Sequence, residues 1–388
     1  MGQNYFSSTS ELYLFFNLSS NLRLLRLDSN DFKGPFPFNM LENSRSLTVL
    51  DIHGNSFNSS TFMLDSLCNL SSLVVLDLSY NLLEGSLPLC LGKLTSLEIL
   101  NLKMNKFGGK IPNELGDLKE LTYLDLSSNS FNSSIPSSLG KLRKLEFLYL
   151  GGGNQLYGTV PSTLGQLSGL KELSISGNSL TGEISESHFM KLKLLKYLEF
   201  YGFVELIVNP QWIPPFQLRH IYINSVNMGN QFPPWLQTQQ NVSLLILRNA
   251  SISGPVPEWF GTTFSSVTDL DLSMNKMHGV LPSSMKNLRS LADVNLSENK
   301  LTGAITEWIG EELSQLQRLR LQSNSFYGVL PSSLKSMTSL PSSGRSSLGS
   351  KVISTSEMEI HASSPSSFLM LIKHYFSVIW GTGRAKVK

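Results

Sequence analysis

Cysteine is scarce in this chain of 388 residues, which contains only Cys68 and Cys90. Two cysteines are too few to build a disulfide framework that would hold a small fold together. Each cysteine lies beside leucines that we expect to pack inward, so the sequence favours two buried free thiols. A disulfide bridge between Cys68 and Cys90 is the alternative.

The chain also lacks an apolar run of the length that crosses a bilayer. Residues 368–380 (FLMLIKHYFSVIW) are apolar but only thirteen in number, and Lys373 and His374 interrupt them, whereas a spanning helix needs about twenty residues. We expect no transmembrane span. An unstructured tail is the preferred interpretation and an interfacial anchor is the alternative. Residues 1–21 show no secretory signal pattern and are interpreted as the remnant of a leading repeat.

An excess of charge of one sign is absent as well, because the formal net charge is +2 and acidic and basic residues are interspersed. A nucleic-acid-binding protein usually carries a basic face, so the composition argues against a nucleic-acid partner. The six histidines stand apart, without an HExxH motif or the Cys/His spacing of a metal site. No Gly-x-Ser-x-Gly motif is present either. The sequence therefore predicts no enzyme, no metal site and no cofactor.

A leucine-rich string with one asparagine recurs along the chain, and residues 97–112 (LEILNLKMNKFGGKIP) show it most completely. Leu100 and Leu102 are two residues apart, so they point to the same side of a short strand, while Asn101 faces the other side. Such a strand cannot bury its apolar side alone and needs a copy on each flank. The spacing therefore predicts a parallel sheet made of stacked repeats.

The rest of the repeat completes the interior. Asn105 follows the strand where the chain turns, and its amide group is expected to bond to backbone groups that the turn leaves unpaired. Phe107 is expected to fill the interior, and Gly109 to permit close approach of the backbone. Leu115 and Leu118 lie three apart in the next segment, which favours a single helical turn packed on the outer side.

The turn position allows the repeats to be counted. Successive turn positions are 23 to 26 residues apart, which gives thirteen repeats, and the eighth of them is degenerate. An extra glycine in residues 151–153 predicts a local bulge. The thirteen turn positions are Asn30, Asn55, Asn81, Asn105, Asn129, Asn154, Asn178, Phe203, Val226, Ala250, Asn275, Asn299 and Asn324.

These patterns divide the chain into a repeat array at residues 22–340 and a tail at residues 341–388. The strands should line the concave side of a curved array and the outer turns the convex side. From residue 332 to residue 367, fifteen of thirty-six residues are serine. Such a segment cannot bury enough apolar surface to offset the entropy of ordering it, so we expect a disordered tail with one short apolar segment.

With these residues in hand, the chain resembles the plant extracellular leucine-rich repeat family, whose copies read LxxLxxLxLxxNxLxGxIP. The match covers about residues 22–340. Within it, residues 209–260 (NPQWIPPFQL, QFPPWLQTQQ and SISGPVPEWF) are similar to plant receptor-like proteins, which resemble receptor kinases that have lost the kinase. The resemblance implies an α/β solenoid, a right-handed horseshoe with a parallel concave β-sheet and about thirteen repeats.

The same resemblance implies an extracellular recognition module at the plasma membrane, in defence or developmental signalling. It implies a peptide or protein ligand, and a membrane co-receptor or adaptor kinase as the signalling partner. A secreted inhibitor of a wall-degrading enzyme is one alternative. An inactive or decoy product is another.

Repeats six to nine carry unusual residues at the outward strand positions. Exposed tyrosine and arginine combine large contact area with a polar group, as interface hot spots do. We therefore predict a ligand-binding band there. The alternative is that the tyrosines only cover neighbouring strands as cross-strand pairs. The band comprises Phe147, Tyr149, Tyr197, Glu199, Tyr201, Arg219, His220 and Tyr222.

Seven Asn-x-Ser sequons occur, and together with the resemblance they support a secreted, glycosylated surface. Asn295 lies between the two strand residues Val294 and Leu296, so it should face the concave side. A glycan at this position would block binding across the twelfth repeat. The sequons start at Asn17, Asn58, Asn69, Asn132, Asn241, Asn249 and Asn295.

Overall fold

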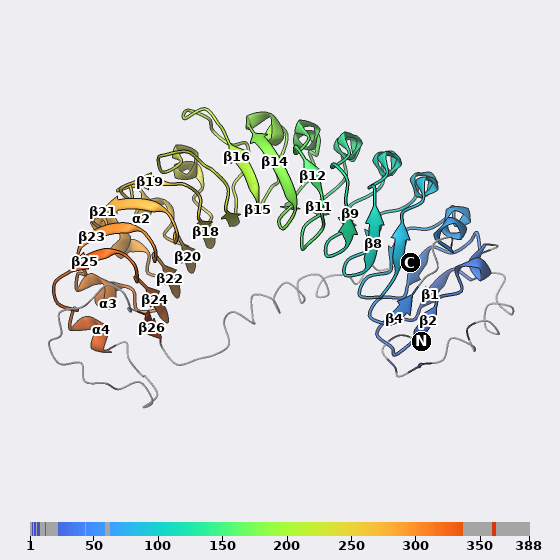
Figure 1. The fold of residues 1–388 in the computed structure, drawn as a ribbon, viewed down its shortest axis with the longest axis horizontal. Coiled ribbons are helices and arrows are strands. Elements are labelled where there is room, and N and C mark those ends of the chain that lie inside the picture. Colours follow the sequence, from blue (N-terminus) through green and yellow to red (C-terminus); the bar gives the residue numbers. More distant parts are fainter. Residues whose placement is uncertain are drawn as a thin grey trace, which may run out of the picture.

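The computed structural model describes residues 22–42, 44–58, 63–336 and 359–361, together with residues 2, 4, 6, 7 and 12. The described chain is a curved stack of repeats, with a row of strands along the inner side of the arc and short helical turns along the outer side (Figure 1). The predicted leucine-rich horseshoe with a concave parallel sheet is therefore confirmed.

The concave sheet holds fourteen described strands, and all but the last, β26, run parallel, which leaves thirteen parallel strands. Each strand pairs with its counterpart in the next repeat, for example Leu100 of β7 with Leu124 of β9. The strands are β1 (Leu24–Arg26), β3 (Val49–Asp51), β5 (Val75–Asp77), β7 (Ile99–Asn101), β9 (Tyr123–Asp125), β11 (Phe147–Tyr149), β13 (Glu172–Ser174), β15 (Tyr197–Tyr201), β17 (His220–Asn224), β18 (Leu244–Arg248), β20 (Asp269–Asp271), β22 (Asp293–Asn295), β24 (Arg318–Arg320) and β26 (Glu359–His361).

A second set of short strands, which the sequence analysis did not predict, follows the turn in most repeats and forms small parallel sheets beside the main one. These strands are β2 (Lys33–Pro35), β4 (Ser56–Asn58), β6 (Glu84–Ser86), β8 (Lys106–Gly109), β10 (Ser130–Phe131), β12 (Tyr157–Gly158), β14 (Ser179–Ile184), β16 (Phe203–Leu206), β19 (Ser253–Gly254), β21 (Lys276–Gly279), β23 (Lys300–Ala304) and β25 (Ser325–Tyr327).

The outer side consists of single helical turns, mostly of the 3₁₀ type. Leu115 and Leu118 of the fourth repeat are fully buried there, as predicted. The turns are η1 (Phe38–Leu41), η2 (Met63–Asn69), η3 (Leu89–Lys93), η4 (Asn113–Asp117), η5 (Ser137–Lys141), η6 (Ser162–Gln166), η7 (Glu186–Phe189), η8 (Pro234–Thr238), α2 (Phe260–Thr263), η9 (Ser283–Asn287), α3 (Trp308–Glu312) and α4 (Ser333–Ser336).

The asparagine at the turn bonds to backbone groups of two repeats, as predicted. Asn105 donates its Nδ2 hydrogens to the carbonyl oxygens of Leu102 (3.1 Å) in its own repeat and Leu78 (2.9 Å) in the previous one. Its Oδ1 accepts the N–H of Leu83 at 3.0 Å. Gly109 is needed for its backbone angle φ of +71° rather than for close approach, because an added Cβ would meet only ordinary contact at 3.5 Å.

The eighth repeat departs from the predicted alignment. Phe203 does not occupy a turn position: β15 runs on to Tyr201, and after Gly202 the chain enters β16, where Phe203 is 80% exposed. Val226 and Ala250 are fully buried. In these three repeats the main strands β15, β17 and β18 each have five residues, instead of the three in most repeats.

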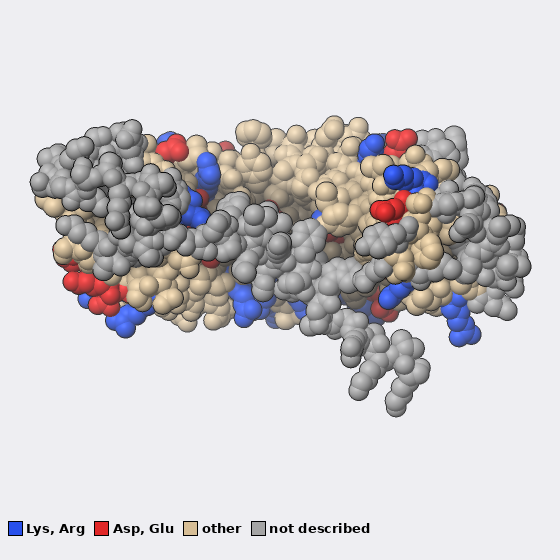
Figure 2. All heavy atoms as spheres, turned by 90° about the horizontal axis from the view of Figure 1, so that it is seen from below, with Lys and Arg blue, Asp and Glu red and all other residues tan. Residues whose placement is uncertain are grey.

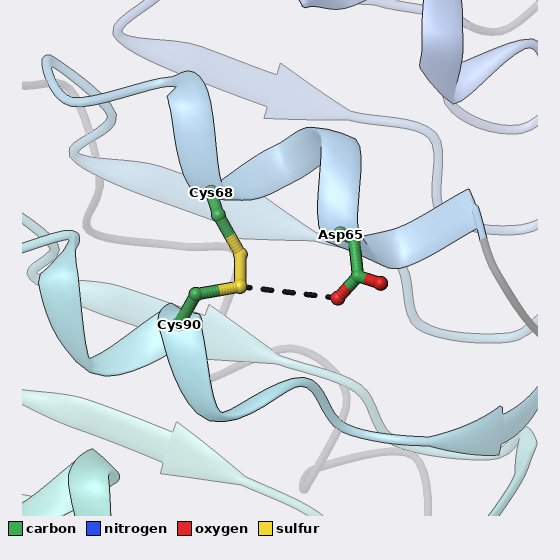
Figure 3. A group of neighbouring side chains, drawn as sticks. All are labelled: Asp65, Cys68 and Cys90. Atoms are coloured by element: carbon green, nitrogen blue, oxygen red, sulfur yellow. Dashed lines mark hydrogen bonds between the residues drawn. A yellow bond between two sulfur atoms is a disulfide. The ribbon is translucent and has the colours of Figure 1, made fainter.

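The preference for free thiols is wrong, because Cys68 of η2 and Cys90 of η3 form a disulfide (Figure 3). Their separation of 22 residues is close to one repeat, so stacking places them on adjacent outer turns with their Cα atoms 5.6 Å apart. Asp65 Oδ1 lies 3.9 Å from Cys90 Sγ, a contact in which the disulfide sulfur has no proton to donate.

Three residues of the segment predicted to be disordered form strand β26, which pairs antiparallel with β24. The rest of residues 341–388, including the apolar residues 368–380, lie outside the described residues, as do most of residues 1–21. Within the described part of the chain, no helix is long and apolar enough to cross a membrane.

Candidate functional site

The predicted band lies on the concave sheet, but it is not continuous. Strand β13 runs between β11 and β15 and pairs with both of them. Glu172 and Ser174 of β13 therefore stand inside the band, although the prediction did not include them. Phe147 and Tyr149 belong to β11; Tyr197, Glu199 and Tyr201 to β15; His220 and Tyr222 to β17; and Arg219 directly precedes β17.

The aromatic residues of the band divide into paired and exposed side chains. Tyr149 is only 7% exposed and donates its hydroxyl to Glu172 Oε2. The Tyr197 ring packs edge-on against the His220 ring, with centroids 5.9 Å apart. Tyr201, in contrast, is 47% exposed. Cross-strand pairing therefore explains Tyr149 and Tyr197, while Tyr201 presents its ring to solvent.

A depression of about 180 Å³ opens on the concave side within this region. It extends from the fourth repeat to the eighth, with Lys103 at one end and Glu199 at the other. Small residues form its floor, because serine or glycine lies near the start of each of the turns that follow β9, β11 and β13. The lining residues are Lys103, Asp125, Ser127, Ser128, Tyr149, Gly151, Gly152, Ser174, Ser176 and Glu199.

Two glycines of the sixth repeat line the depression and lie close against the turns of the neighbouring repeats. A Cβ atom added to Gly151 would come within 2.7 Å of the Ser176 carbonyl oxygen. One added to Gly152, whose φ is +73°, would come within 2.6 Å of Ser128 Oγ. The contact at Gly151 is with backbone and is too short for a real Cβ, so glycine there permits close packing against the seventh repeat. At Gly152 the positive φ favours glycine.

Hydroxyl groups hold the carboxylates of the depression. Glu199 accepts hydrogen bonds from Ser174 Oγ (2.6 Å) and Tyr197 OH (3.0 Å) at Oε2, and from Ser176 Oγ (2.9 Å) at Oε1. Asp125 Oδ1 accepts both the N–H (2.9 Å) and the Oγ–H (2.5 Å) of Ser127.

Burial governs the acidity of two of these groups. It raises the pKa of Asp125 above its usual value, although the Ser127 hydrogen bonds and the Lys103 charge pull that pKa down. Burial likewise raises the pKa of Glu172, against the hydrogen bond from Tyr149. For both groups, the cost of removing the charged form from water exceeds what the neighbouring donors return.

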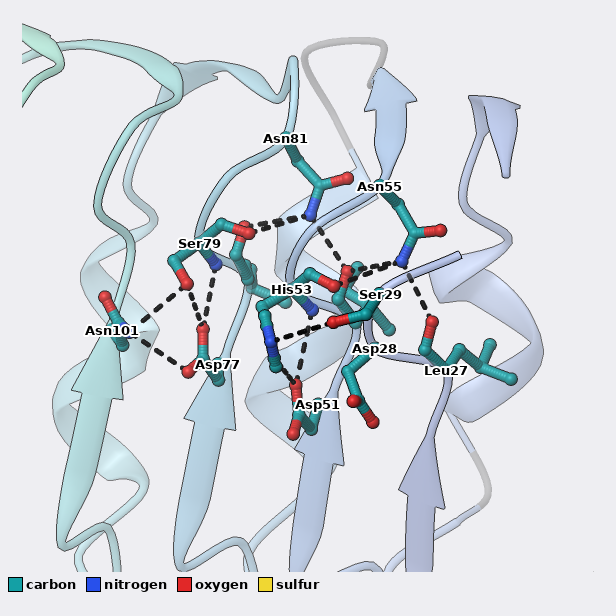
Figure 4. A network of polar contacts seen from close by, with 12 residues as sticks. Leu27, Asp28, Ser29, Asp51, His53, Asn55, Asp77, Ser79, Asn81 and Asn101 are labelled. Atoms are coloured by element: carbon teal, nitrogen blue, oxygen red, sulfur yellow. Dashed lines mark hydrogen bonds and ion pairs between the residues drawn. The ribbon is translucent and has the colours of Figure 1, made fainter. Parts of the chain in front are cut away.

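A second polar cluster lies on the concave side of the second and third repeats, around Asp51, His53 and Asp77 (Figure 4). Their potential ligand atoms lie within 4.8 Å of one another, close enough to surround a metal ion. However, His53 Nδ1 already lies 2.7 Å from Asp51 Oδ1. Asp77 accepts hydrogen bonds from Ser79 at Oδ1 and from Asn101 at Oδ2. The cluster is a closed hydrogen-bonded network that a metal ion would have to break.

A second group contains residue types that can bind a metal ion, namely Asp65, Cys68 and Cys90. This group is also unsuited to a metal. Both sulfur atoms belong to the disulfide (Figure 3), and a metal needs the thiolate form of cysteine. The described residues thus offer the concave depression, not a metal site, as the candidate functional site.

Charged side chains on the concave side lie in small groups of both signs rather than in one field (Figure 2). Toward the end of the array, Asp293 is held by two arginines: Arg318 contacts Oδ2 and Arg320 lies 3.2 Å from Oδ1. This mixed distribution gives no continuous basic surface among the described residues of the visible face.

The sequons differ in their exposure. The five at Asn58, Asn69, Asn132, Asn241 and Asn249 are exposed. Asn295 lies in β22 on the concave side, as predicted, and its Nδ2, the atom that a glycan would occupy, donates to Asp271 Oδ2 at 3.0 Å. A glycan on Asn295 would leave Nδ2 with a single hydrogen to donate. Asn17 lies outside the described residues.

Sequence reasoning missed much of the depression. Lys103 and Asp125 lie in repeats that match the consensus well, so nothing marked them as unusual. The extra glycine of the sixth repeat stands out in the sequence, but its effect depends on the serines of the flanking repeats. The second and third positions after the strand hold only serine or glycine in three successive repeats, and this is the signal that would have found the depression.

Comparison with family models gives two matches. A model described as leucine-rich repeat region matches residues 31–252, and a leucine-rich repeat model matches residues 315–337. Among curated proteins, Receptor-like protein EIX2 of Solanum lycopersicum is 38% identical over 119 residues, and Receptor-like protein EIX1 of the same plant is 36% identical over 121 residues. These matches cover 30% and 31% of this chain but only 12% of each relative.

Two solved plant structures are similar over most of the array. The ectodomain of the Arabidopsis thaliana receptor kinase GASSHO1/SCHENGEN3, in complex with CASPARIAN STRIP INTEGRITY FACTOR 2, has a TM-score of 0.65 and 29% identity, and the match covers 82% of this chain and 40% of that one. The Arabidopsis receptor kinase HAESA, in complex with the peptide hormone IDA and the co-receptor SERK1, has a TM-score of 0.60 and 26% identity, with coverage of 80% and 60%.

Proposed function

The chain belongs to the plant leucine-rich repeat family, and on this premise we propose that it is the ligand-recognition module of a receptor-like protein. The ligand is a peptide or protein, and it binds along the concave side of repeats five to nine. We propose no enzymatic activity.

The observation that carries this proposal is the concave depression together with the side chains that border it. Interfaces draw most of their binding energy from a few aromatic and arginine residues around a site that excludes water. Tyr201 at the end of β15 and Arg219 before β17 are exposed, and Glu199 of β15 lines the depression. This stretch therefore combines a recess with residues suited to anchor a ligand.

The two solved plant receptors support a peptide ligand, since one contains a peptide hormone and the other an integrity factor. HAESA is also in complex with a co-receptor. We extend this by proposing that the present chain acts through a membrane co-receptor or adaptor kinase, in plant defence or developmental signalling.

An extracellular location, at the surface of the plasma membrane, completes the proposal. The Cys68–Cys90 disulfide is of the kind that persists in oxidising compartments. The five exposed sequons agree with passage through the secretory pathway.

The test is a selection of peptides from a displayed random library on the secreted array, produced with an added signal peptide. Peptides selected on the unmodified chain are then measured against the triple variant Tyr201→Ala, Arg219→Ala, Tyr222→Ala. We expect the triple variant to bind at least about tenfold more weakly, because it removes aromatic and arginine anchors.

A matched control uses two exposed tyrosines of the lateral strands, Tyr157 (55% exposed) and Tyr327 (69% exposed). The variant Tyr157→Ala, Tyr327→Ala should bind the same peptides as the unmodified chain. Equal binding by the triple variant, with unchanged circular dichroism, would place recognition elsewhere and contradict the proposal.

A further inference from the structure

Most of the hydroxyl protons around the depression are donated to carboxylates. A serine or tyrosine hydroxyl has one proton to donate, and beyond that it offers only lone pairs. Four lining hydroxyls give this proton to an acidic side chain. The four donors are Ser127, Tyr149, Ser174 and Ser176, and the acceptors are Asp125, Glu172 and Glu199.

Backbone donors at the floor are committed as well. The N–H of Gly152 donates to the Ser176 carbonyl oxygen at 3.1 Å, and the N–H of Ser128 donates to the Gly151 carbonyl oxygen at 3.0 Å. Lys103 is the single cationic side chain among the lining residues, and it lies at the end opposite Glu199. The Glu199 end of the depression therefore presents mainly hydrogen-bond acceptors.

The acidic groups here also differ from Asp293, which is met by two arginines. Among the described residues, none of Asp125, Glu172 and Glu199 forms a salt bridge with Lys, Arg or His. A carboxylate has about four lone-pair positions. Glu199 Oε1 accepts one hydrogen bond, from Ser176 Oγ, so it has capacity for a further donor.

We infer that the Glu199 end of the depression receives a cationic group of the ligand, either an arginine or lysine side chain or a free amino terminus. A guanidinium or ammonium group supplies several donors and no acceptor, which matches a lining of lone pairs. A neutral polyol would bring acceptors that find few donors there. The inference rests on the proposed function, because it names the chemistry of the ligand that this face recognises.

The raised pKa values of Asp125 and Glu172, both caused mainly by burial, agree with this inference. Burial disfavours the charged form of both groups, and the neighbouring hydrogen-bond donors do not fully counter this cost. A bound cation would supply the missing countercharge in a partly desolvated site, where charge-assisted hydrogen bonds are strong.

The test uses small probes, so that it does not depend on the natural ligand. Binding of Nα-acetyl-arginine amide to the whole chain is followed by NMR titration, with Nα-acetyl-citrulline amide as the neutral probe of the same shape. We expect the arginine probe to bind at least about tenfold more tightly than the citrulline probe, because only the arginine probe forms charge-assisted hydrogen bonds to the carboxylate.

Two variants should shift arginine binding in opposite directions. Glu199→Gln removes the acceptor charge and weakens binding, whereas Lys103→Ala removes the competing cation and tightens it. Glu183→Gln, an exposed position on the lateral strand β14, is the matched control and leaves binding unchanged. If Glu199→Gln impairs folding, the test relies on Lys103→Ala. Tighter arginine binding by that variant supports the inference, because loss of structure cannot tighten binding.

Equal binding of the two probes, or arginine binding that neither variant changes, overturns the inference. This test and the test of the proposed function can fail independently of each other. Arginine binding with the expected variant pattern, but no displayed peptide selected on the concave side, supports the inference and contradicts the proposed function. Selected peptides that lack a basic group and bind Glu199→Gln equally well overturn the inference and leave the proposed function standing.

Discussion

At the scale of single residues, the turn asparagines join neighbouring repeats. Asn129 is 6% exposed and donates to the carbonyl oxygens of Leu126 (3.2 Å) and, in the previous repeat, Leu102 (2.9 Å). Its Oδ1 accepts the N–H of Phe107 at 3.0 Å. The sequence predicted this role because the reach of one amide to nearby backbone groups is local chemistry, repeated at a fixed period.

Replacement of this asparagine should be costly. Asn129→Ala leaves buried backbone groups of two repeats without partners, so we expect the free energy of unfolding to fall by about 3 kcal/mol. Urea unfolding followed by circular dichroism measures the change. The control is Asn132→Ala, three residues away but exposed, which should change stability by about 0.5 kcal/mol or less. Equal effects of both variants would contradict the bridging role.

At the scale of elements, backbone pairing replaces side-chain bridging in the middle of the array. Repeats eight to ten lack the turn asparagine, and their main strands are longer. Five residue pairs join β15 to β17, and five join β17 to β18, whereas three join β7 to β9. The sequence shows that these asparagines are missing. It does not show that longer strands replace their bonds, because the length of a strand depends on how many residues of the neighbouring repeat pair with it.

The disulfide shows why the cysteine prediction failed. The small number of cysteines and the leucines beside them favoured free thiols over a bridge. However, a repeat array brings residues one period apart into contact, and Cys68 and Cys90 are separated by 22 residues. The repeat period that predicted the fold therefore also indicates which residues on adjacent outer turns can pair. The alignment of the outer turns brings the two cysteines together, and the number of cysteines does not show this alignment.

Reduction of this disulfide should loosen the second and third repeats. Closing a loop of this size restricts the unfolded chain and contributes about 3 kcal/mol to stability. Thermal unfolding with and without a reductant should therefore show a lower midpoint for the reduced protein. The double variant Cys68→Ser, Cys90→Ser should match the reduced protein and show no response to the reductant. A response in the double variant would assign the effect to another cause.

At the scale of the whole molecule, the curved array and its buried leucines could be predicted from sequence, whereas the depression could not. The repeat spacing determines which side chains face inward, and the same spacing can be read from each repeat separately. The depression needs small residues in three consecutive repeats, with Lys103 and Glu199 as its two ends. No single repeat contains this information, so the prediction included Tyr149 and Glu199 but missed Lys103 and Asp125.

Several buried groups on the concave side should make the array more stable in mild acid. Burial raises the pKa values of Asp77, Asp125, Glu172 and Asp293. For His53, burial lowers the pKa, but the hydrogen bond and charge of Asp51 outweigh it, so the net direction is upward. A group with a raised folded-state pKa contributes stability below its unfolded value and loses that contribution as pH rises through the folded value.

We therefore expect the thermal unfolding midpoint to rise as pH falls from about 8 to about 5, since all five groups act in the same direction. The ordinary values are 6.5 for His53, 3.8 for the aspartates and 4.5 for Glu172. Glu307 has a lowered pKa, but its effect falls below 4.5 and outside this window.

Differential scanning calorimetry across this pH range measures how the unfolding midpoint changes with pH. The variant Glu172→Gln should show a smaller change of the midpoint with pH than the unmodified chain. Because Glu172 titrates from a raised value, replacing it removes its share of the gain on acidification. A midpoint that falls steadily between pH 8 and pH 5 would show that the buried groups do not control the pH response.

Strand β26 has a consequence for how separate molecules meet. In the main sheet, β1 lies at one edge and β24 is the last parallel strand at the other. An uncovered parallel edge at each end would let one molecule add to the next, head to tail, without closure. Because β26 pairs antiparallel on β24, the chain itself occupies the parallel edge of β24. A second molecule that approached this end would have to pair with β26 instead of β24.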